Sequence, residues 1–142
     1  MAGLGSPDAL SVQQEDLLVA RVGPHFVGLF YNALENQRGL MRNFFADTAK
    51  LVWNGNTCYT KEDIGKFYDS LPACRIDVIC ADGEAFLHQG QRALGLVVGG
   101  LIKFLDDGWV QFKEVFVLTG ENNGWKVAED TFCLQGPVPQ RD

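Results

Sequence analysis

The spacing of apolar residues changes from a helical to a strand period about halfway along the chain. In the first part, apolar residues recur every three or four positions, as on one face of an amphipathic helix. The residues of this stripe are Leu17, Leu18, Val22, Phe26, Leu29, Phe30 and Ala33. They predict a long helix ending near Asn36, and Pro24 falls inside it, where a proline kinks or breaks a helix.

Two shorter helices are predicted on either side of a first strand. One carries the apolar residues Leu40, Met41, Phe44 and Phe45. The other begins at Thr60, because residues 60–63 form a variant of the capping box with Asp in place of Glu or Gln. Pro72 ends this helix, and its apolar face is formed by Ile64, Phe67, Tyr68 and Leu71.

The strand between these helices, residues 50–53, ends in a tight turn. Asn54 and Gly55 are the residues that tolerate the positive φ angles of a two-residue hairpin turn. Trp53 stands beside the turn, where a large aromatic side chain either closes an edge of the core or lines a pocket.

From Arg75 onward the pattern indicates strands joined by tight turns. Long strands are predicted over residues 93–104, 109–118 and 125–134, after a first one that starts at Arg75. Helices followed by a meander predict an α+β fold: a single-domain cone of about three N-terminal helices on a strongly curved antiparallel sheet. We expect a flexible arm over residues 1–14, the folded domain over 15–136 and a tail over 137–142.

Two details of these strands bear on function. The alternation of apolar and polar residues is interrupted around Lys113 and Glu114, and again between Val127 and Phe132. Such interruptions are typical of β-bulges, which bend a sheet. Apolar residues also occupy both faces of the strands near Val97 and Val115, although a solvated face should be polar. The sequence therefore predicts that another protein covers the face without helices; loops or the N-terminal arm are the alternative cover.

Composition narrows the class of protein. The chain has 142 residues, 46% of them hydrophobic and 21% charged, which fits one globular domain. The net charge of −6 argues against direct binding to nucleic acid and to anionic membrane surfaces. The N-terminus lacks a signal peptide, and the apolar stretch 93–102 is too short to span a bilayer, so we expect a soluble intracellular protein.

The chemistry-bearing residues form no known catalytic or metal motif. The four cysteines, Cys58, Cys74, Cys80 and Cys133, have no metal-ligand spacing to each other or to the two histidines, so mostly buried, reduced thiols are expected. Two disulfides in a secreted protein are the alternative. Candidate acids and bases in a cone-shaped pocket are Asp47, Asp77, Asp106, Asp107, Glu114, Asp130, His88 and Tyr31. Because none is paired by spacing, we expect no enzyme activity, no cofactor and no metal.

Several segments match a known family in their order and spacing, from about Leu17 to Gln135. They are residues 26–31, Leu51-Val52-Trp53-Asn54-Gly55-Asn56, Ser70-Leu71-Pro72, Val97-Val98-Gly99, Phe116-Val117-Leu118, Gly124-Trp125-Lys126-Val127-Ala128 and Asp130-Thr131-Phe132. Together they resemble the nuclear transport factor 2 family. The Trp-Asn-Gly-Asn run is most similar to its export-related branch, the small partner of the general messenger-RNA export receptor.

The resemblance implies a cone that dimerises through its open sheet face. In the export branch, the partner is a similar domain in the large receptor subunit, and the heterodimer passes nuclear pores by contacting Phe-Gly repeat nucleoporins. RNA would be bound only indirectly, through the partner, and no membrane would be involved. The expected location is the nucleus, the nuclear pore and the cytoplasm.

The resemblance also assigns residues to this interface. Carried over to this sequence, the partner-binding face would include Leu96, Val98, Lys113, Val115, Val117, Thr131 and Cys133. Phe116, Leu118, Phe132 and Leu134 would then face the core. A pocket at the mouth of the cone would involve Trp53, Asn54, Asp106 and Asp107.

Two positions depart from the family pattern. The import member of the family binds Ran-GDP with an acidic residue after the Trp and an acidic pair in a later turn; here the first is Asn54, while Asp106 and Asp107 retain the pair. Family members usually carry an Arg where this chain has Cys133, and in the export branch that Arg is expected to form a salt bridge across the heterodimer. A homodimeric import carrier for Ran-GDP, and an isomerase or dehydratase on the same fold, remain the alternative functions.

Overall fold

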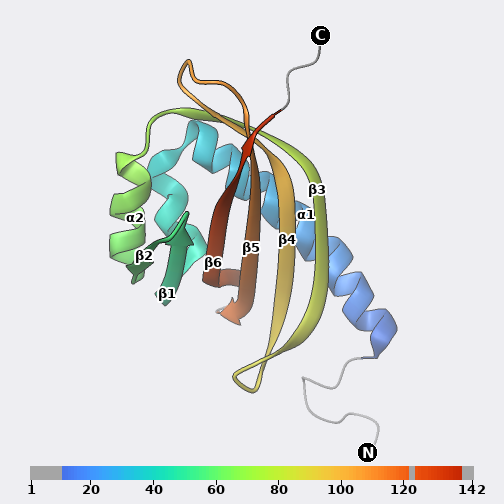
Figure 1. Ribbon diagram of the computed structural model, residues 1–142. Helices are drawn as coiled ribbons and strands as arrows, with labels where there is room; N and C mark the ends of the chain where they lie inside the picture. Colours follow the sequence, from blue (N-terminus) through green and yellow to red (C-terminus); the bar gives the residue numbers. More distant parts are fainter. Residues whose placement is uncertain (1–10, 122–123, 139–142) are drawn as a thin grey trace, which may run out of the picture.

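Three helices cover one face of a six-stranded curved sheet (Figure 1). The computed structural model describes residues 11–121 and 124–138. The helices are α1 (Val12–Asn36), the 3-10 helix η2 (Arg38–Phe44) and α2 (Lys61–Ser70). The strands are β1 (Phe45–Trp53), β2 (Asn56–Tyr59), β3 (Cys74–His88), β4 (Gln91–Phe104), β5 (Val110–Glu121) and β6 (Gly124–Pro137), in the sheet order β2-β1-β6-β5-β4-β3. The predicted α+β cone is confirmed.

Helix α1 is longer than its apolar stripe predicts. Ser11 caps it, because the Ser11 hydroxyl accepts a hydrogen bond from the Gln14 backbone and the Gln14 side chain accepts one from the Ser11 backbone. The expected arm over residues 1–14 is therefore wrong for residues 12–14, and residues 1–10 lie outside the described part. Pro24 does not interrupt the helix.

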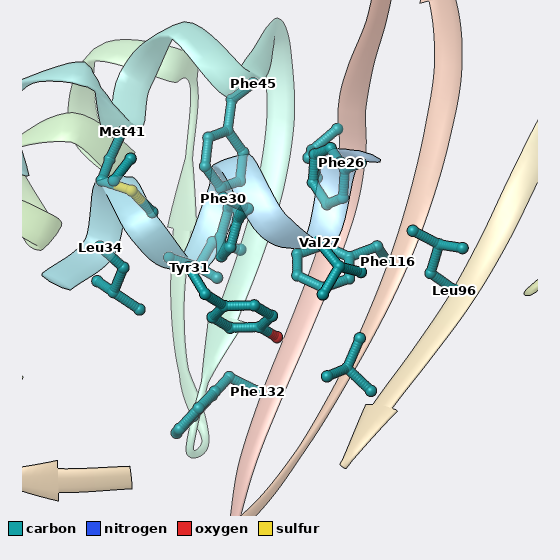
Figure 2. Close-up of a cluster of buried hydrophobic side chains, with 14 of the residues drawn as sticks. Phe26, Val27, Phe30, Tyr31, Leu34, Met41, Phe45, Leu96, Phe116 and Phe132 are labelled. Carbon is teal, nitrogen blue, oxygen red and sulfur yellow. The ribbon is translucent and has the colours of Figure 1, made fainter. Parts of the chain in front are cut away.

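By length and composition, α1 alone among the described helices would be able to cross a membrane, a property shared by core helices of soluble proteins. Here α1 lies across the sheet, and its inward face supplies Phe26, Phe30 and Leu34 to the core (Figure 2). The apolar residues of α1 are interrupted by polar ones, so the helix contains no long uninterrupted apolar stretch.

The turn after β1 and the cap of α2 follow the sequence closely. Asn54 and Gly55 have φ angles of 47° and 91°, and β1 and β2 pair in antiparallel fashion across this turn. Thr60 is the N-cap of α2, and its side chain accepts a hydrogen bond of 3.3 Å from the Asp63 backbone. The turn and the start of α2 at Thr60 are confirmed, but the reciprocal bond of a capping box is not formed, because the Thr60 backbone N–H donates to the Ala49 carbonyl.

The sheet is mixed rather than antiparallel. Strand β1 lies beside β6 and runs parallel to it, with Trp53 in register with Phe132. The other strand pairs are antiparallel, as predicted. A meander pattern identifies strands that are neighbours along the chain, whereas the β1–β6 pair joins segments about half the chain apart.

Of the two predicted phase slips, one is correct. Strand β6 carries a bulge between Val127 and Glu129, which moves the buried positions from Val127 to Asp130 and Phe132. The slip predicted at Lys113 and Glu114 is wrong, since Glu114 keeps the inward phase of β5 and is fully buried. Glu114 is a charged residue at an inward position, so it looks like a break in the apolar pattern although the alternation of β5 continues.

The core lies between the helices and the inner face of β4, β5 and β6. Its aromatic residues pack edge to face, with Phe30 at 4.9 Å from Phe116 and Phe26 at 5.1 Å from Phe116 between ring centroids. Figure 2 shows Leu96 and Phe132 from the sheet beside these helix residues. The opposite face of the sheet carries no helix (Figure 1).

Candidate functional site

The face of β4 that points away from the helices is partly apolar. Val97 is 41% exposed, whereas its neighbours Leu96 and Val98 are 2% and 0% exposed and belong to the core. The assignment of Leu96 and Val98 to the partner-binding face is therefore wrong by one position in register. Alternation along a strand places Gly95, Val97, Gly99 and Leu101 on the uncovered face instead.

The other residues assigned to that face are where the sequence predicts them. Val115 is 36% exposed in β5, and Val117 is half-buried on the same face. Thr131 and Cys133 are exposed in β6, and they lie in register with Val115 and Lys113 respectively. We call the outward residues of β3–β6 the open face; its centre is formed by Val97, Leu101, Val115 and Val117.

Of the residues predicted to face the core, all but Leu134 do so. Phe116, Leu118 and Phe132 are almost fully buried, as predicted. Leu134 lies in register with the buried Phe112 but is 36% exposed, next to a second irregularity in the β5–β6 register between Leu134 and Gly136.

The open face also carries two free thiols. Cys80 and Cys133 are exposed, Cys58 is half-buried and Cys74 is buried. Burial raises the pKa of the Cys74 thiol, and the neighbouring Arg38 lowers it by a smaller amount. The expectation of mostly buried thiols is wrong for Cys80 and Cys133, while all four cysteines are unpaired as predicted.

Trp53 closes the core and does not line an open pocket. It is 7% exposed, and its ring stacks on Phe132 with centroids 3.8 Å apart. Asn54 is exposed in the turn, and its side-chain oxygen accepts a hydrogen bond of 3.2 Å from the Leu134 backbone. Asp106 and Asp107 are exposed in the turn between β4 and β5. The structure thus shows no shared pocket of these four residues among the cavities it describes.

Two carboxyl groups meet inside the cone. Glu114 and Asp130 are 0% and 1% exposed, and they occupy neighbouring inward positions of β5 and β6. The Tyr31 hydroxyl donates a hydrogen bond of 2.7 Å to Glu114 Oε1, and the Tyr68 hydroxyl donates one of 3.4 Å to Asp130 Oδ2. The sequence named Glu114, Asp130 and Tyr31 separately; the fold brings them together and adds Tyr68.

These groups hold their protons more tightly than usual. Burial raises the pKa of Glu114, with the neighbouring Asp130 and the hydrogen bond from Tyr31 opposing it. Burial and the neighbouring Glu114 raise the pKa of Asp130 well above its ordinary value. Burial also raises the pKa of both tyrosines. Both carboxyl groups are enclosed by the core, whereas Tyr31 also lines a cavity of about 480 Å³ between α1 and β3.

The remaining candidate acids and bases do not form a site. Asp47 and Asp77 are exposed. His88 lies 3.8 Å from Glu129 near the end of β3. Within residues 11–121 and 124–138, no group of three His, Cys, Asp or Glu side chains is placed to hold a metal ion.

The geometry defines a class of protein: a cone of helices against a curved sheet whose outer face is open. A family model, the nuclear transport factor 2 (NTF2) domain, matches residues 22–134. The chain belongs to this family. It is similar to NTF2-related export protein 1 of Bos taurus, with 29% identity over 122 residues, 81% of this chain and 87% of the relative.

Solved structures share the fold. Nuclear transport factor 2 from Cryptosporidium parvum gives a TM-score of 0.72 at 20% identity, covering 86% of this chain and 95% of that one. A chain of the C. albicans Mtr2-Mex67 M domain complex gives 0.66 at 13% identity, covering 84% and 94%. The fold also occurs in an enzyme, the LinA hexachlorocyclohexane dehydrochlorinase, with a TM-score of 0.70 at 9% identity, covering 91% and 93%. Fold alone therefore does not assign function.

Proposed function

We propose that this chain is the small, non-enzymatic subunit of a heterodimeric messenger-RNA export receptor. Its open face binds a similar domain of the large receptor subunit, and the heterodimer passes nuclear pores by contacting Phe-Gly repeat nucleoporins. RNA is contacted only through the partner. The names of the curated relatives, which are NTF2-related export proteins, support this proposal.

The observation that carries the proposal is the exposed apolar centre of the open face. Val97 and Val115 are 41% and 36% exposed and in register with each other, half-buried Val117 follows on the same face of β5, and half-buried Leu101 lies further along β4. A contiguous apolar patch on a sheet marks an interaction surface, because leaving it in water is unfavourable. An open sheet face of this kind fits the sheet of a second cone.

Lys113 fits the same proposal. The family resemblance leads one to expect an Arg at position 133, where this chain has Cys133. Lys113 is exposed on the open face and lies directly in register with Cys133. The face therefore still offers a positive charge there, one strand away, to an acidic residue of the partner.

The Ran-GDP import alternative has less support. The side-chain oxygen of Asn54 is engaged by the Leu134 backbone, and an amide cannot form an ion pair with a lysine as a carboxylate does. Asp106 and Asp107 are exposed and free of ion pairs among the described residues. A titration with Ran-GDP at physiological salt tests this alternative, with Asp106→Ala/Asp107→Ala as the variant that should abolish genuine binding.

Co-expression with the large export receptor of the same organism tests the main proposal. We expect a one-to-one complex that survives gel filtration. Val115→Glu should disrupt it, because burying an unpaired carboxylate in an apolar interface costs several kcal/mol or more. Asp47→Lys, a charge change at an exposed position of β1, is the control. A stable monomer that captures no receptor would refute the proposal.

A further inference from the structure

The open face contains a hollow where β3, β4 and β5 lie side by side. It has a volume of about 290 Å³, and its apolar walls are Phe86, Val97, Val115 and Val117. These walls belong to three strands, so the hollow is a feature of the sheet and not of a loop. It is continuous with the apolar centre of the open face, because Val97, Val115 and Val117 belong to both.

A glycine creates the hollow. Gly95 lies in β4 directly before Leu96, and a Cβ atom at Gly95 would lie 3.2 Å from the Phe86 ring. Any side chain at position 95 would therefore meet the ring and occupy the space above the strand. The Phe86 ring itself is 37% exposed, and it offers an aromatic wall to whatever covers the face.

One rim of the hollow is acidic. Asp82 and Glu84 line it from β3, in register with Val97 and Gly95 of β4. Both are exposed, and neither forms an ion pair with another described residue. An occupant that brings a positive charge to this rim would gain a complementary contact.

We propose that this hollow receives one large aliphatic or aromatic side chain from the partner's sheet face, flanked there by a Lys or Arg that meets Asp82 and Glu84. This inference rests on the proposed heterodimer and identifies its central contact. Buried apolar anchors that fill a pocket commonly dominate the affinity of an interface, and surrounding charges set the association rate. A second copy of this chain would bring its own Asp82 and Glu84 to the interface, together with the exposed Lys113 of its open face.

Filling the hollow tests the apolar part of the contact. Gly95→Leu should weaken the complex with the co-expressed large receptor subunit by about 30-fold or more, the loss of one anchor residue. Thr57→Leu adds bulk at an exposed position of β2, outside the open face, and it should have a much smaller effect. Affinities are measured by titration calorimetry, with circular dichroism as the check on folding.

Reversing the rim charges tests the second part and does not depend on how Gly95→Leu folds. Asp82→Lys/Glu84→Lys changes two exposed residues and should slow association by about tenfold at low salt, with a smaller effect at high salt. Asp106→Lys/Asp107→Lys makes the same change in net charge at the distant β4–β5 turn and should have little effect.

The outcomes separate the hollow from the heterodimer. If the unchanged chain binds no receptor subunit, the proposed function fails and the hollow has no partner to receive. If it binds, but Gly95→Leu and Thr57→Leu weaken it equally, or the two charge reversals act alike, the hollow is not the anchor. A selective loss in Gly95→Leu and in Asp82→Lys/Glu84→Lys supports both parts of the inference.

Discussion

Glu114 and Asp130 place two acidic groups in an aromatic core. Each accepts one hydrogen bond from a tyrosine, and the remaining oxygens, Glu114 Oε2 and Asp130 Oδ1, receive none from any other described residue. Burial raises the pKa of Glu114, and burial together with the neighbouring Glu114 raises that of Asp130, so the pair keeps a proton to higher pH than separate carboxyl groups in water would.

The retained proton makes stability depend on pH. Since the pKa values of the pair are raised in the folded protein, the folded state holds a proton that the unfolded chain releases above about pH 4. The free energy of unfolding should then fall by about 1.4 kcal/mol per pH unit from about pH 5 upward, until the raised pKa is passed. Urea unfolding at several pH values measures this slope.

Glu114→Gln is the matched test of the shared proton. The amide oxygen can still accept from Tyr31, and the amide nitrogen can donate to Asp130, so no proton needs to be retained. We expect a flatter pH slope and, at pH 8, a gain of about 1–3 kcal/mol over the unchanged chain. Glu114→Ala, which leaves a cavity and an unpaired tyrosine, should be less stable at every pH. An unchanged slope in Glu114→Gln would contradict the shared proton.

Successive residues of strand β4 alternate between the core and the open face. Leu96 and Val98 are buried under the helices, while Val97 between them is 41% exposed. Because both sets are apolar, the strand can serve a folded core and a protein interface at once. The two roles should therefore be separable by substitutions at adjacent positions.

Leu96→Ala and Val97→Ala form such a pair. Leu96→Ala should lower the free energy of unfolding of the isolated chain by about 2–5 kcal/mol, since it leaves a cavity in the core. Val97→Ala should change it by less than about 1 kcal/mol, because the side chain is already partly in water. In the complex the order reverses, and Val97→Ala should weaken partner binding more. Chemical unfolding and a binding titration on both variants check this; equal effects on stability would contradict the assigned faces.

The sequence predicts local elements here better than it predicts faces. The α2 cap at Thr60 and the turn at Asn54 are encoded by neighbouring residues, and both are correct. The inward phase of β4 is not encoded locally, since Leu96 and Val97 are both apolar and a shift of one residue exchanges the faces. The meeting of Glu114 with Asp130 depends on the β6 bulge, which only the paired strands define. The same holds for the parallel pairing of β1 with β6.

At the scale of the whole molecule, charge and shape favour different partners. The open face is apolar enough to attract any similar sheet, including that of a second copy. The chain, however, has a net charge of −6, so two copies repel each other over distances beyond the contact itself. A heterodimer with a basic partner surface removes this repulsion, and the acidic rim at Asp82 and Glu84 then becomes attractive.

Because charge opposes self-association and favours the heterodimer, added salt should change the strengths of these two complexes in opposite directions. Raising the salt concentration from about 0.05 to about 0.5 M screens exposed charges, so it should strengthen self-association of the isolated chain and weaken the heterodimer. Sedimentation velocity of the chain alone, and a binding titration with the receptor subunit, measure the two trends. Asp82→Lys/Glu84→Lys, which lowers the negative charge of the open face, should increase self-association at low salt while it weakens the heterodimer. If salt weakens self-association instead, charge attraction holds the copies together, and the open face is built for a second copy of this chain.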